Sequence, residues 1–409
     1  MEKKYSTRQV AAIVAVTVAF SICITAIALY SFILVGNRYT ISFNADEVKY
    51  QNVTKFNQVR NILKSDYYKD VDENILIEGA VSGLAQSLKD PYTVYFNKDE
   101  MRTFMEKSEG SYVGIGVTVN TDENGVLTVV EPFENSPAAV AGMRKGDKII
   151  KIDDTKVDSL GDENMIINMI KGKENTKVNI TVYRPSDGNY HQFEVMRKRI
   201  KTTNIKSKIL DGNIGYIKLV MFDSEIAEYF QKELNSMMKK GIKGLIIDLR
   251  DNPGGSYEQV CKIADTLLPE GLIVYTEDRN GTKQERRSDS KYVDLPLVLI
   301  TNGNSASASE ILAGAVKDNA RGTLVGTNTF GKGLVQELRM LEDGSGIKVT
   351  ISRYFTPSGV CIHGKGIKPD IEIDVLNEYR DLPVSQIPEN MDVQLKSAVE
   401  AVQMELKNK

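Results

Sequence analysis

Two short polar segments could together form a hydrolase site that uses a serine and a lysine. The first covers residues 304–310, with the sequence NSASASE, and the second covers Thr329–Gln336. A serine nucleophile needs a base to accept its proton, and that base is usually a histidine or an unprotonated lysine. Because the chain has only two histidines, His191 and His363, the glycine-flanked Lys332 is the leading candidate for the base.

The serine-rich segment lies between a predicted strand and a predicted helix. Leu295–Thr301 is a continuous apolar run, typical of a strand covered on both faces, and Ser309–Asp318 carries apolar residues at helical spacing. A nucleophile at such a junction is exposed at the edge of a sheet, where free N–H groups at the helix start can hold an oxyanion. A capping box is the alternative, because Ser307 and Glu310 have its Ser-x-x-Glu spacing.

Lys332 and Gln336 are four positions apart, so they share a face whether the segment is a strand or a helix. Gly331 and Gly333 let the backbone beside Lys332 approach another element closely. The Gln336 amide could therefore orient the amine. An exposed lysine in a surface hairpin is the alternative.

A third segment, residues 244–255, indicates a second buried strand that ends in a glycine-rich turn. The backbone N–H groups of Gly254 and Gly255 could donate hydrogen bonds to an oxyanion. An ordinary turn at the end of a strand is the alternative.

Taken together, these segments resemble the carboxyl-terminal processing peptidases, also called tail-specific proteases. The resemblance implies that Ser307 is the nucleophile, Lys332 the base and Gln336 a further catalytic residue. It also implies oxyanion stabilisation by the Gly254/Gly255 turn and the Ala308 amide. The similarity extends to three more segments: Asp90-Pro91-Tyr92-Thr93, Gly114-Ile115-Gly116-Val117 and residues 364–370.

Length and composition limit the number of domains and the kinds of partner and cofactor that this chain can have. A chain of 409 residues is too long for one ordinary core and suggests two or three domains. Its 52 basic and 55 acidic residues are nearly balanced, and no basic stripe indicates a nucleic-acid partner. Three cysteines and two histidines without metal-ligand spacing argue against a zinc site, and we expect no cofactor.

The N-terminal region has the pattern of a membrane anchor. Val10–Val35 is 26 mostly apolar residues, long enough to cross a bilayer of roughly 30 Å. Lys3, Lys4 and Arg8 precede it, so the positive-inside tendency places the N-terminus in the cytoplasm and the catalytic region outside the cell membrane. A cleaved signal peptide is the main alternative, although its apolar core is usually shorter. A buried core helix is a third interpretation.

Residues 111–198 have the pattern of a compact β-rich unit and resemble a PDZ domain. PDZ domains bind an extended peptide as an added strand and hold its terminal carboxylate on the N–H groups of a glycine-containing loop. Here that loop contains Gly114, Ile115, Gly116 and Val117, so the expected partners are proteins or peptides with free apolar C-termini. A plain β-rich packing domain is the alternative.

Helical patterns flank these units, over residues 55–88 and 391–409. In the family that this chain resembles, such segments often join in a homodimer, whereas packing within one chain is an equal alternative. Between residues 199 and 374, strand-like and helix-like stretches alternate, which predicts an α/β core. The resemblance implies that this core is of the ClpP/crotonase type. The predicted regions are a cytoplasmic N-terminus (1–8), a transmembrane anchor (9–37), an N-terminal helical region (38–110), the PDZ domain (111–198), the protease core (199–375) and a C-terminal helical segment (376–409).

The sequence therefore predicts a membrane-anchored, extracytoplasmic serine endopeptidase that captures peptide tails with its PDZ domain and cleaves them through an acyl-enzyme. A non-catalytic PDZ adaptor derived from a protease is the alternative function. An esterase that uses the same two residues is a third, but it has no use for a peptide-binding domain.

Overall fold

The computed structural model describes residues 50–121, 125–157, 163–202, 204–380 and 382–408. The chain divides into two compact units, Met1–Ala80 and Val81–Lys409. Across the described ranges, no helix is both long and apolar enough to cross a membrane. The predicted anchor at residues 9–37 lies outside these ranges.

The first unit contains helix α2 (Tyr50–Asp66) and the beginning of α3 (Glu73–Gln86), where the sequence predicted one helical stretch. Arg60 and Lys64 of α2 both form ion pairs with Glu73. The large apolar side chains that suggested a packed stripe are exposed, and self-association through this region remains a prediction. These side chains are Val59, Ile62, Leu63, Ile75 and Ile77.

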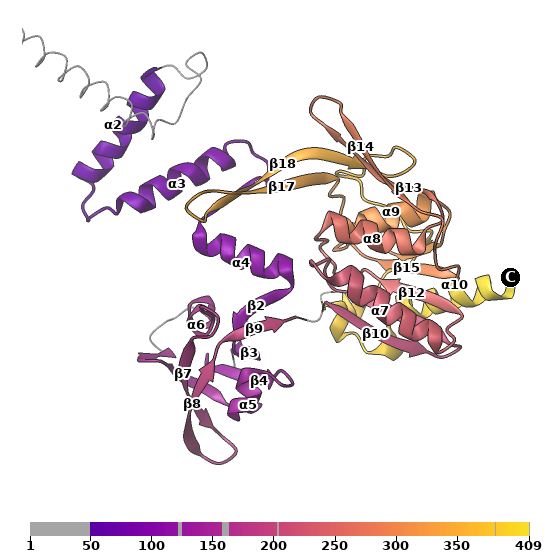
Figure 1. The fold of residues 1–409 in the computed structure, drawn as a ribbon, viewed down its shortest axis with the longest axis horizontal. Coiled ribbons are helices and arrows are strands. Elements are labelled where there is room, and N and C mark those ends of the chain that lie inside the picture. The colour runs from indigo at the N-terminus through magenta and orange to yellow at the C-terminus, as the bar shows by residue number, and fades with distance from the viewer. Residues whose placement is uncertain (1–49, 122–124, 158–162, 203, 381, 409) are drawn as a thin grey trace, which may run out of the picture. The chain divides into compact units, whose positions relative to one another are not determined.

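The β-rich unit begins after α4 (Lys98–Glu109) and has a sheet of order β3-β4-β5-β7-β8, with β6 beside β5 and a separate β2–β9 pair (Figure 1). The segment 113–119 is divided between two strands, because Gly116 adopts φ 77° between β2 and β3. Strand β8 was not predicted, since its side chains are mostly exposed and polar. The elements are β2 (Ser111–Gly114), β3 (Val117–Thr121), β4 (Leu127–Pro132), α5 (Pro137–Ala141), β5 (Lys148–Ile152), β6 (Thr155–Lys156), α6 (Glu163–Ile170), β7 (Lys177–Arg184), β8 (Asn189–Met196) and β9 (Lys198–Lys201).

The largest core is built on a six-stranded sheet of order β10-β11-β12-β15-β16-β19. All neighbours in it are parallel except β10 and β11. The predicted buried runs form β12 and β15, in which every residue is buried. The strands are β10 (Ile205–Leu210), β11 (Ile214–Leu219), β12 (Gly244–Asp248), β15 (Leu297–Thr301), β16 (Thr323–Gly326) and β19 (Ile371–Glu372).

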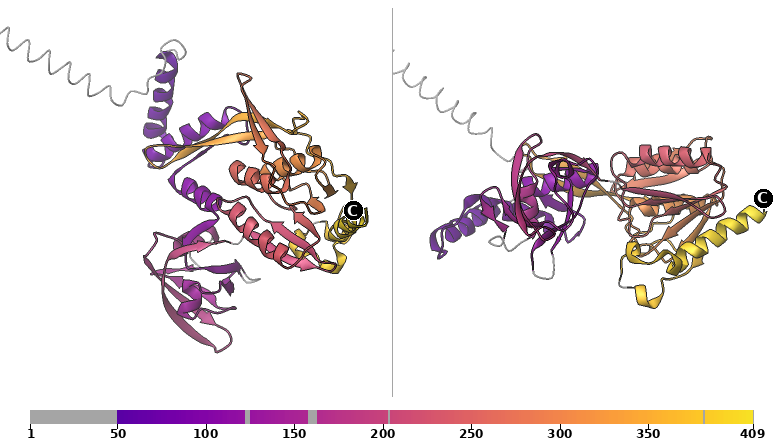
Figure 2. Two further views of the ribbon diagram at one scale, coloured as in Figure 1. Left: turned by 45° about the vertical axis from the view of Figure 1, so that its right-hand side comes forward. Right: turned by 90° about the horizontal axis from the view of Figure 1, so that it is seen from below.

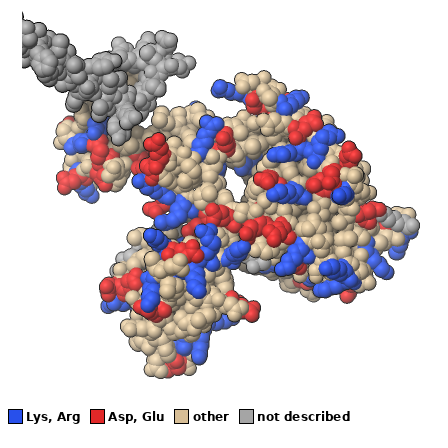
Figure 3. Space-filling view, viewed as in Figure 1, with Lys and Arg blue, Asp and Glu red and all other residues tan. Residues whose placement is uncertain are grey.

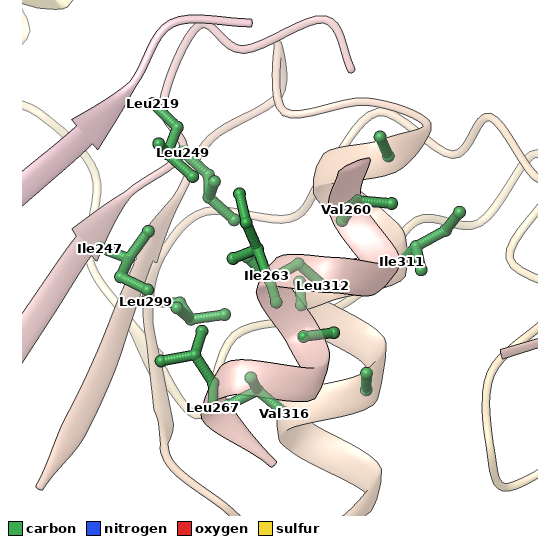
Figure 4. Packing of buried hydrophobic residues seen from close by; sticks show 14 of the residues in the cluster. Leu219, Ile247, Leu249, Val260, Ile263, Leu267, Leu299, Ile311, Leu312 and Val316 are labelled. Carbon is green, nitrogen blue, oxygen red and sulfur yellow. The ribbon is translucent and has the colours of Figure 1, made fainter. Parts of the chain in front are cut away.

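Helices cover both faces of this sheet. The helices α7 (Ile226–Lys239), α8 (Tyr257–Leu267) and α9 (Ala308–Asp318) pack against one face. Figure 4 shows Ile263 and Leu267 of α8 on the side of the helix that faces strand side chains such as Leu299. On the other face lies α10 (Val393–Asn408), which covers a second apolar cluster (Figure 2, right).

The C-terminal helix therefore packs within its own chain. Leu395, Ala398, Ala401 and Val402 of α10 are all buried in the apolar cluster on the sheet. This is the intramolecular alternative for residues 391–409, so the apolar stripe of this helix is not evidence for a dimer. Helix α10 begins within two residues of the predicted stretch, and three short 3₁₀ turns precede it at Asn377–Tyr379, Val384–Gln386 and Glu389–Met391.

A second sheet, of order β1-β18-β13-β14 with β17 beside β18, was not predicted. Most of its strands are half-exposed and carry charged residues, and the longest apolar run among them is the four residues Leu272–Tyr275 of β13. They are β1 (Val94–Phe96), β13 (Gly271–Asp278), β14 (Lys283–Ser288), β17 (Leu334–Met340) and β18 (Gly346–Phe355). Acidic and basic side chains are interspersed on the face shown in Figure 3, in keeping with the balanced charge of the chain.

Candidate active site

The three segments with candidate catalytic residues follow three neighbouring parallel strands. Residues 249–256 follow β12, residues 302–307 follow β15, and residues 327–333 follow β16. The carboxyl ends of parallel strands meet at one edge of a sheet, which is where open α/β sheets place their sites. The sheet order therefore brings together segments that are about 80 residues apart in the sequence.

Ser307 is held in an unusual backbone conformation at the start of α9. Its φ is 55° and its ψ is −112°, a sparsely populated region that costs about 1–3 kcal/mol unless the surroundings enforce it. Three hydrogen bonds enforce it here: Ala306 N–H donates to Asn252 O (3.0 Å), Ser307 N–H donates to Glu310 Oε2 (2.8 Å), and the Tyr354 hydroxyl donates to Ser307 O (3.0 Å). A strained turn between strand and helix is typical of exposed nucleophiles in hydrolases.

Burial separates Ser307 from the serines on either side of it. Ser305 and Ser309 are fully buried, and their hydroxyls donate to Leu249 O (2.8 Å) and Asn252 O (2.9 Å). Ser307 is only half-buried. Of the three serines, Ser307 is thus the one that a substrate can reach, while its neighbours fasten the loop to the turn after β12.

The turn after β12 lies directly against Ser307. A Cβ atom on Gly254 would be 2.8 Å from Ser307 Cβ and 2.9 Å from Ala308 N, so only glycine fits there without a shift. The Gly254 N–H already donates to Asn252 Oδ1 (2.9 Å). Within the described part of the chain, no hydrogen bond is found for the N–H of Ala308 or Gly255. Among the three predicted oxyanion donors, Ala308 and Gly255 are therefore the two that remain available.

Lys332 lies in the loop before β17, where glycines permit close packing. A Cβ on Gly333 would be 2.7 Å from His363 N, and Gly331 has φ 92°. Burial lowers the pKa of the Lys332 amine, and the positive charge of Lys348 lowers it further, against the opposing charges of Glu310 and Asp90. A lysine with a lowered pKa has the character that a general base needs.

Glu310 joins the nucleophile segment to the lysine segment, a role that the sequence did not reveal. Its Oε2 accepts hydrogen bonds from the backbone N–H of both Ser307 and Lys332, each at 2.8 Å. Its Oε1 accepts from Gly331 N–H (2.7 Å) and the Thr329 hydroxyl (2.6 Å). The capping-box spacing correctly predicted the bond to Ser307, but nothing in it pointed to the other three donors. This fully buried carboxylate fixes the backbone of both predicted catalytic residues.

Gln336 lies at an irregular point of strand β17. A register shift between Val335 and Gln336 breaks the alternation of side chains along β17. The Gln336 amide nitrogen is 3.5 Å from Thr350 Oγ1, a long hydrogen bond toward β18. A catalytic role for Gln336 beside the Lys332 amine remains a prediction.

The β-rich unit contains a pocket at the predicted carboxylate-binding loop. The pocket has a volume of about 190 Å³, enough for an aliphatic side chain. The predicted residues Gly114, Ile115, Gly116 and Val117 line it, and α6 contributes Ile167 and Ile170. For Ile115 and Gly116, no N–H hydrogen bond to another described residue is found. A Cβ on Gly116 would be 2.5 Å from Ser136 Cβ, which explains the glycine.

Comparisons with known proteins agree with this organisation. The family model described as peptidase family S41 matches residues 213–373, a PDZ domain model matches 111–196, and the model "Activating protease CtpB N-terminal domain" matches 36–100. The carboxy-terminal processing protease CtpA of Bacillus subtilis is 34% identical over 368 residues, covering 89% of this chain and 78% of CtpA. A probable CtpA-like serine protease of Staphylococcus aureus is 32% identical, covering 91% and 74%. The structure of a photosystem II D1 C-terminal processing protease is 26% identical, covers 80% of this chain and 94% of its own, and gives a TM-score of 0.46.

Proposed function

Because this chain is a serine-type peptidase that belongs to family S41 with the carboxy-terminal processing proteases, we propose that it is an endopeptidase for proteins with free apolar C-terminal tails. The PDZ domain captures the tail, and Ser307 attacks a peptide bond of the bound chain. The observation that carries this proposal is the half-exposed, strained Ser307 beside two available N–H groups and tied through Glu310 to Lys332.

The proposed chemistry is an acyl transfer in two halves. In the first, the neutral Lys332 amine takes the proton from Ser307 Oγ as that oxygen bonds to the substrate carbonyl carbon. The N–H groups of Ala308 and Gly255 hold the negative oxygen of the intermediate. The lysine returns its proton to the leaving amine, which leaves an ester on Ser307. Water, activated by the same amine, then hydrolyses the ester.

A fluorogenic peptide compared with a simple ester tests the reaction class. We expect efficient turnover of the peptide with an apolar free C-terminus and poor turnover of the ester. An adaptor would cleave neither substrate. Turnover of the ester alone would favour an esterase and contradict the proposal.

The capture of C-terminal tails gives a second measurable prediction. Amidating the C-terminus of a peptide, or replacing its last apolar residue with aspartate, should weaken binding to the full chain by roughly tenfold or more, because the first change removes the carboxylate and the second places a charge in the apolar pocket. Fluorescence polarisation with the Ser307→Ala chain, which cannot consume the peptide, measures this. A peptide with an internal aspartate is the matched control. Equal affinity for the free and amidated tails would defeat the prediction.

We also propose that residues 9–37 anchor the protein in the cell membrane with the catalytic region outside. The support is the uncharged apolar stretch and the preceding Lys3, Lys4 and Arg8. The full chain should stay in the membrane pellet after carbonate extraction, whereas a chain that starts at residue 38 should be released. Protease added outside intact cells should digest the catalytic region. A soluble product shortened by the mass of the N-terminal segment would instead indicate a cleaved signal peptide.

A further inference from the structure

The turn formed by residues 90–93 lies against the proposed base. The Lys332 amine is 4.7 Å from the centroid of the Tyr92 ring, within the range of a cation–π contact. The same ring meets the His363 ring edge to face, with centroids 6.4 Å apart. His363 in turn lies beside the backbone of Gly333. Tyr92 is thus packed against both the amine and the loop that borders it.

Hydrogen bonds fix this turn to the strands beside Lys332. Asp90 accepts from Tyr92 N–H (3.0 Å) and from the Thr93 hydroxyl (2.6 Å). Thr93 Oγ1 accepts from Thr350 N–H of β18 (3.1 Å). The chain then continues into β1, where Val94 pairs with Lys348 of β18. Because β18 also pairs with β17, which follows Lys332, the ring has a defined place relative to the amine.

We propose that Tyr92 is a positioning residue for Lys332, whose ring face holds the amine and favours the ammonium ion that forms when it accepts the Ser307 proton. This inference rests on the proposed function, since it requires Lys332 to be the base. It gives the Asp90-Pro91-Tyr92-Thr93 segment a role in the reaction.

The physical reason is that the ring treats the two states of the amine differently. The negative face of an aromatic ring attracts an ammonium ion but gives little to a neutral amine. The contact therefore strengthens as the proton moves from Ser307 Oγ to Lys332 Nζ, and an interaction that strengthens toward the transition state raises kcat.

Several charged groups act on the same amine. Burial and the charge of Lys348 lower the Lys332 pKa, while Glu310 and Asp90 act in the opposite direction. His363, which contacts the Tyr92 ring, is a further titratable neighbour. The ring thus stabilises the ammonium at a site whose burial disfavours it.

Two substitutions of Tyr92 separate the ring face from the hydroxyl. Tyr92→Phe keeps the ring and should retain kcat within about twofold. Tyr92→Leu keeps an apolar cover but loses the ring, so kcat on the high-pH plateau, where Lys332 is neutral in both chains, should fall roughly 3- to 30-fold with little change in KM. The rising limb of its pH–rate profile should move down by about 0.4–1.5 pH units, because the ammonium loses its partner. These values are measured with the full chain and a fluorogenic peptide.

A matched control removes a similar contact elsewhere. Lys283 lies over the Tyr275 ring at 5.1 Å on the β13–β14 hairpin, so Tyr275→Leu should leave kcat and the pH profile unchanged. Thr93→Val provides a second test that keeps the ring but releases the turn from Thr350. It should lower kcat, whereas Thr93→Ser should not. If Tyr92→Leu lowers the melting temperature, the comparison of Thr93→Val with Thr93→Ser tests the inference instead.

Parent kcat and an unmoved pH profile in a folded Tyr92→Leu chain would overturn the inference, as would an equal loss in Tyr92→Phe. Should Tyr92→Leu not fold, parent kcat in Thr93→Val would overturn it. Ser307→Ala and Lys332→Met are assayed beside these variants. If either of them keeps parent activity, the proposed function itself fails. If both are inactive while the Tyr92 and Thr93 variants match the parent, only the positioning role fails.

Discussion

Ser307→Ala should abolish peptide cleavage, with a loss on the order of 10⁴–10⁶ in kcat, because the alanine side chain has no oxygen to form the acyl-enzyme. Binding should survive, since the PDZ pocket and the Ala308 and Gly255 amides are unchanged. The measurement is single-turnover cleavage of a fluorogenic peptide, with mass spectrometry of the parent chain to detect the ester on Ser307. This variant would also trap substrates for identification.

Ser305→Ala and Ser309→Ala are matched controls on either side of the nucleophile. Both hydroxyls are buried and bonded to the turn after β12, so their loss should cost about 1 kcal/mol of stability each. Activity should remain substantial at temperatures well below unfolding. An inactive Ser309→Ala beside an active Ser307→Ala would assign the nucleophile to Ser309 and overturn the mechanism.

The parts of this fold that the sequence predicted are those with continuous or periodic apolar residues. Gly244–Asp248 and Leu297–Thr301 are buried on both faces, so each is an apolar run apart from its polar or glycine ends. The sheet that contains β17 and β18 is half-exposed and mixed in polarity. Its pairing depends on contacts between distant segments, which periodicity in one segment cannot reveal.

In the candidate site, too, the sequence revealed features that depend on neighbouring residues but not those that depend on contacts between distant segments. The sequence correctly predicted that Ser307 lies between a strand and a helix, because the apolar patterns of both elements are in the residues next to it. Glu310 looked like a helix cap alone, since its other donors come from residues 329–332. The register shift beside Gln336 could not be predicted either, because it depends on how β17 pairs with β18. Tyr92 lies about 240 positions before Lys332, and only the fold brings the two together.

Lys332→Met should be inactive and yet fold at least as stably as the parent near neutral pH. Removing a general base costs roughly 10²–10⁴ in rate. The stability effect follows from the lowered pKa of the buried amine. A basic group with a lowered pKa binds fewer protons in the folded than in the unfolded state, so it destabilises the fold at pH values below its unfolded pKa. Methionine removes that penalty. The difference in unfolding free energy between variant and parent should therefore shrink as the pH rises toward the unfolded pKa.

The pH dependence of the parent enzyme also tests whether Lys332 is the base. Parent kcat should rise with pH through the lowered pKa of Lys332, because only the neutral amine can take the Ser307 proton. Lys332→Arg should be inactive at every pH, since a guanidinium keeps its proton and cannot act as a base. His191→Gln and His363→Gln complete the series and should retain the rising limb. Turnover by Lys332→Met, or a limb that disappears with either histidine, would mean that the base is not this lysine. Neither Lys332→Met nor Lys332→Arg has a base at this position, so both should be inactive. Lys332→Met has no positive charge in the site, whereas Lys332→Arg keeps one, so comparing their stabilities measures the effect of the buried charge alone.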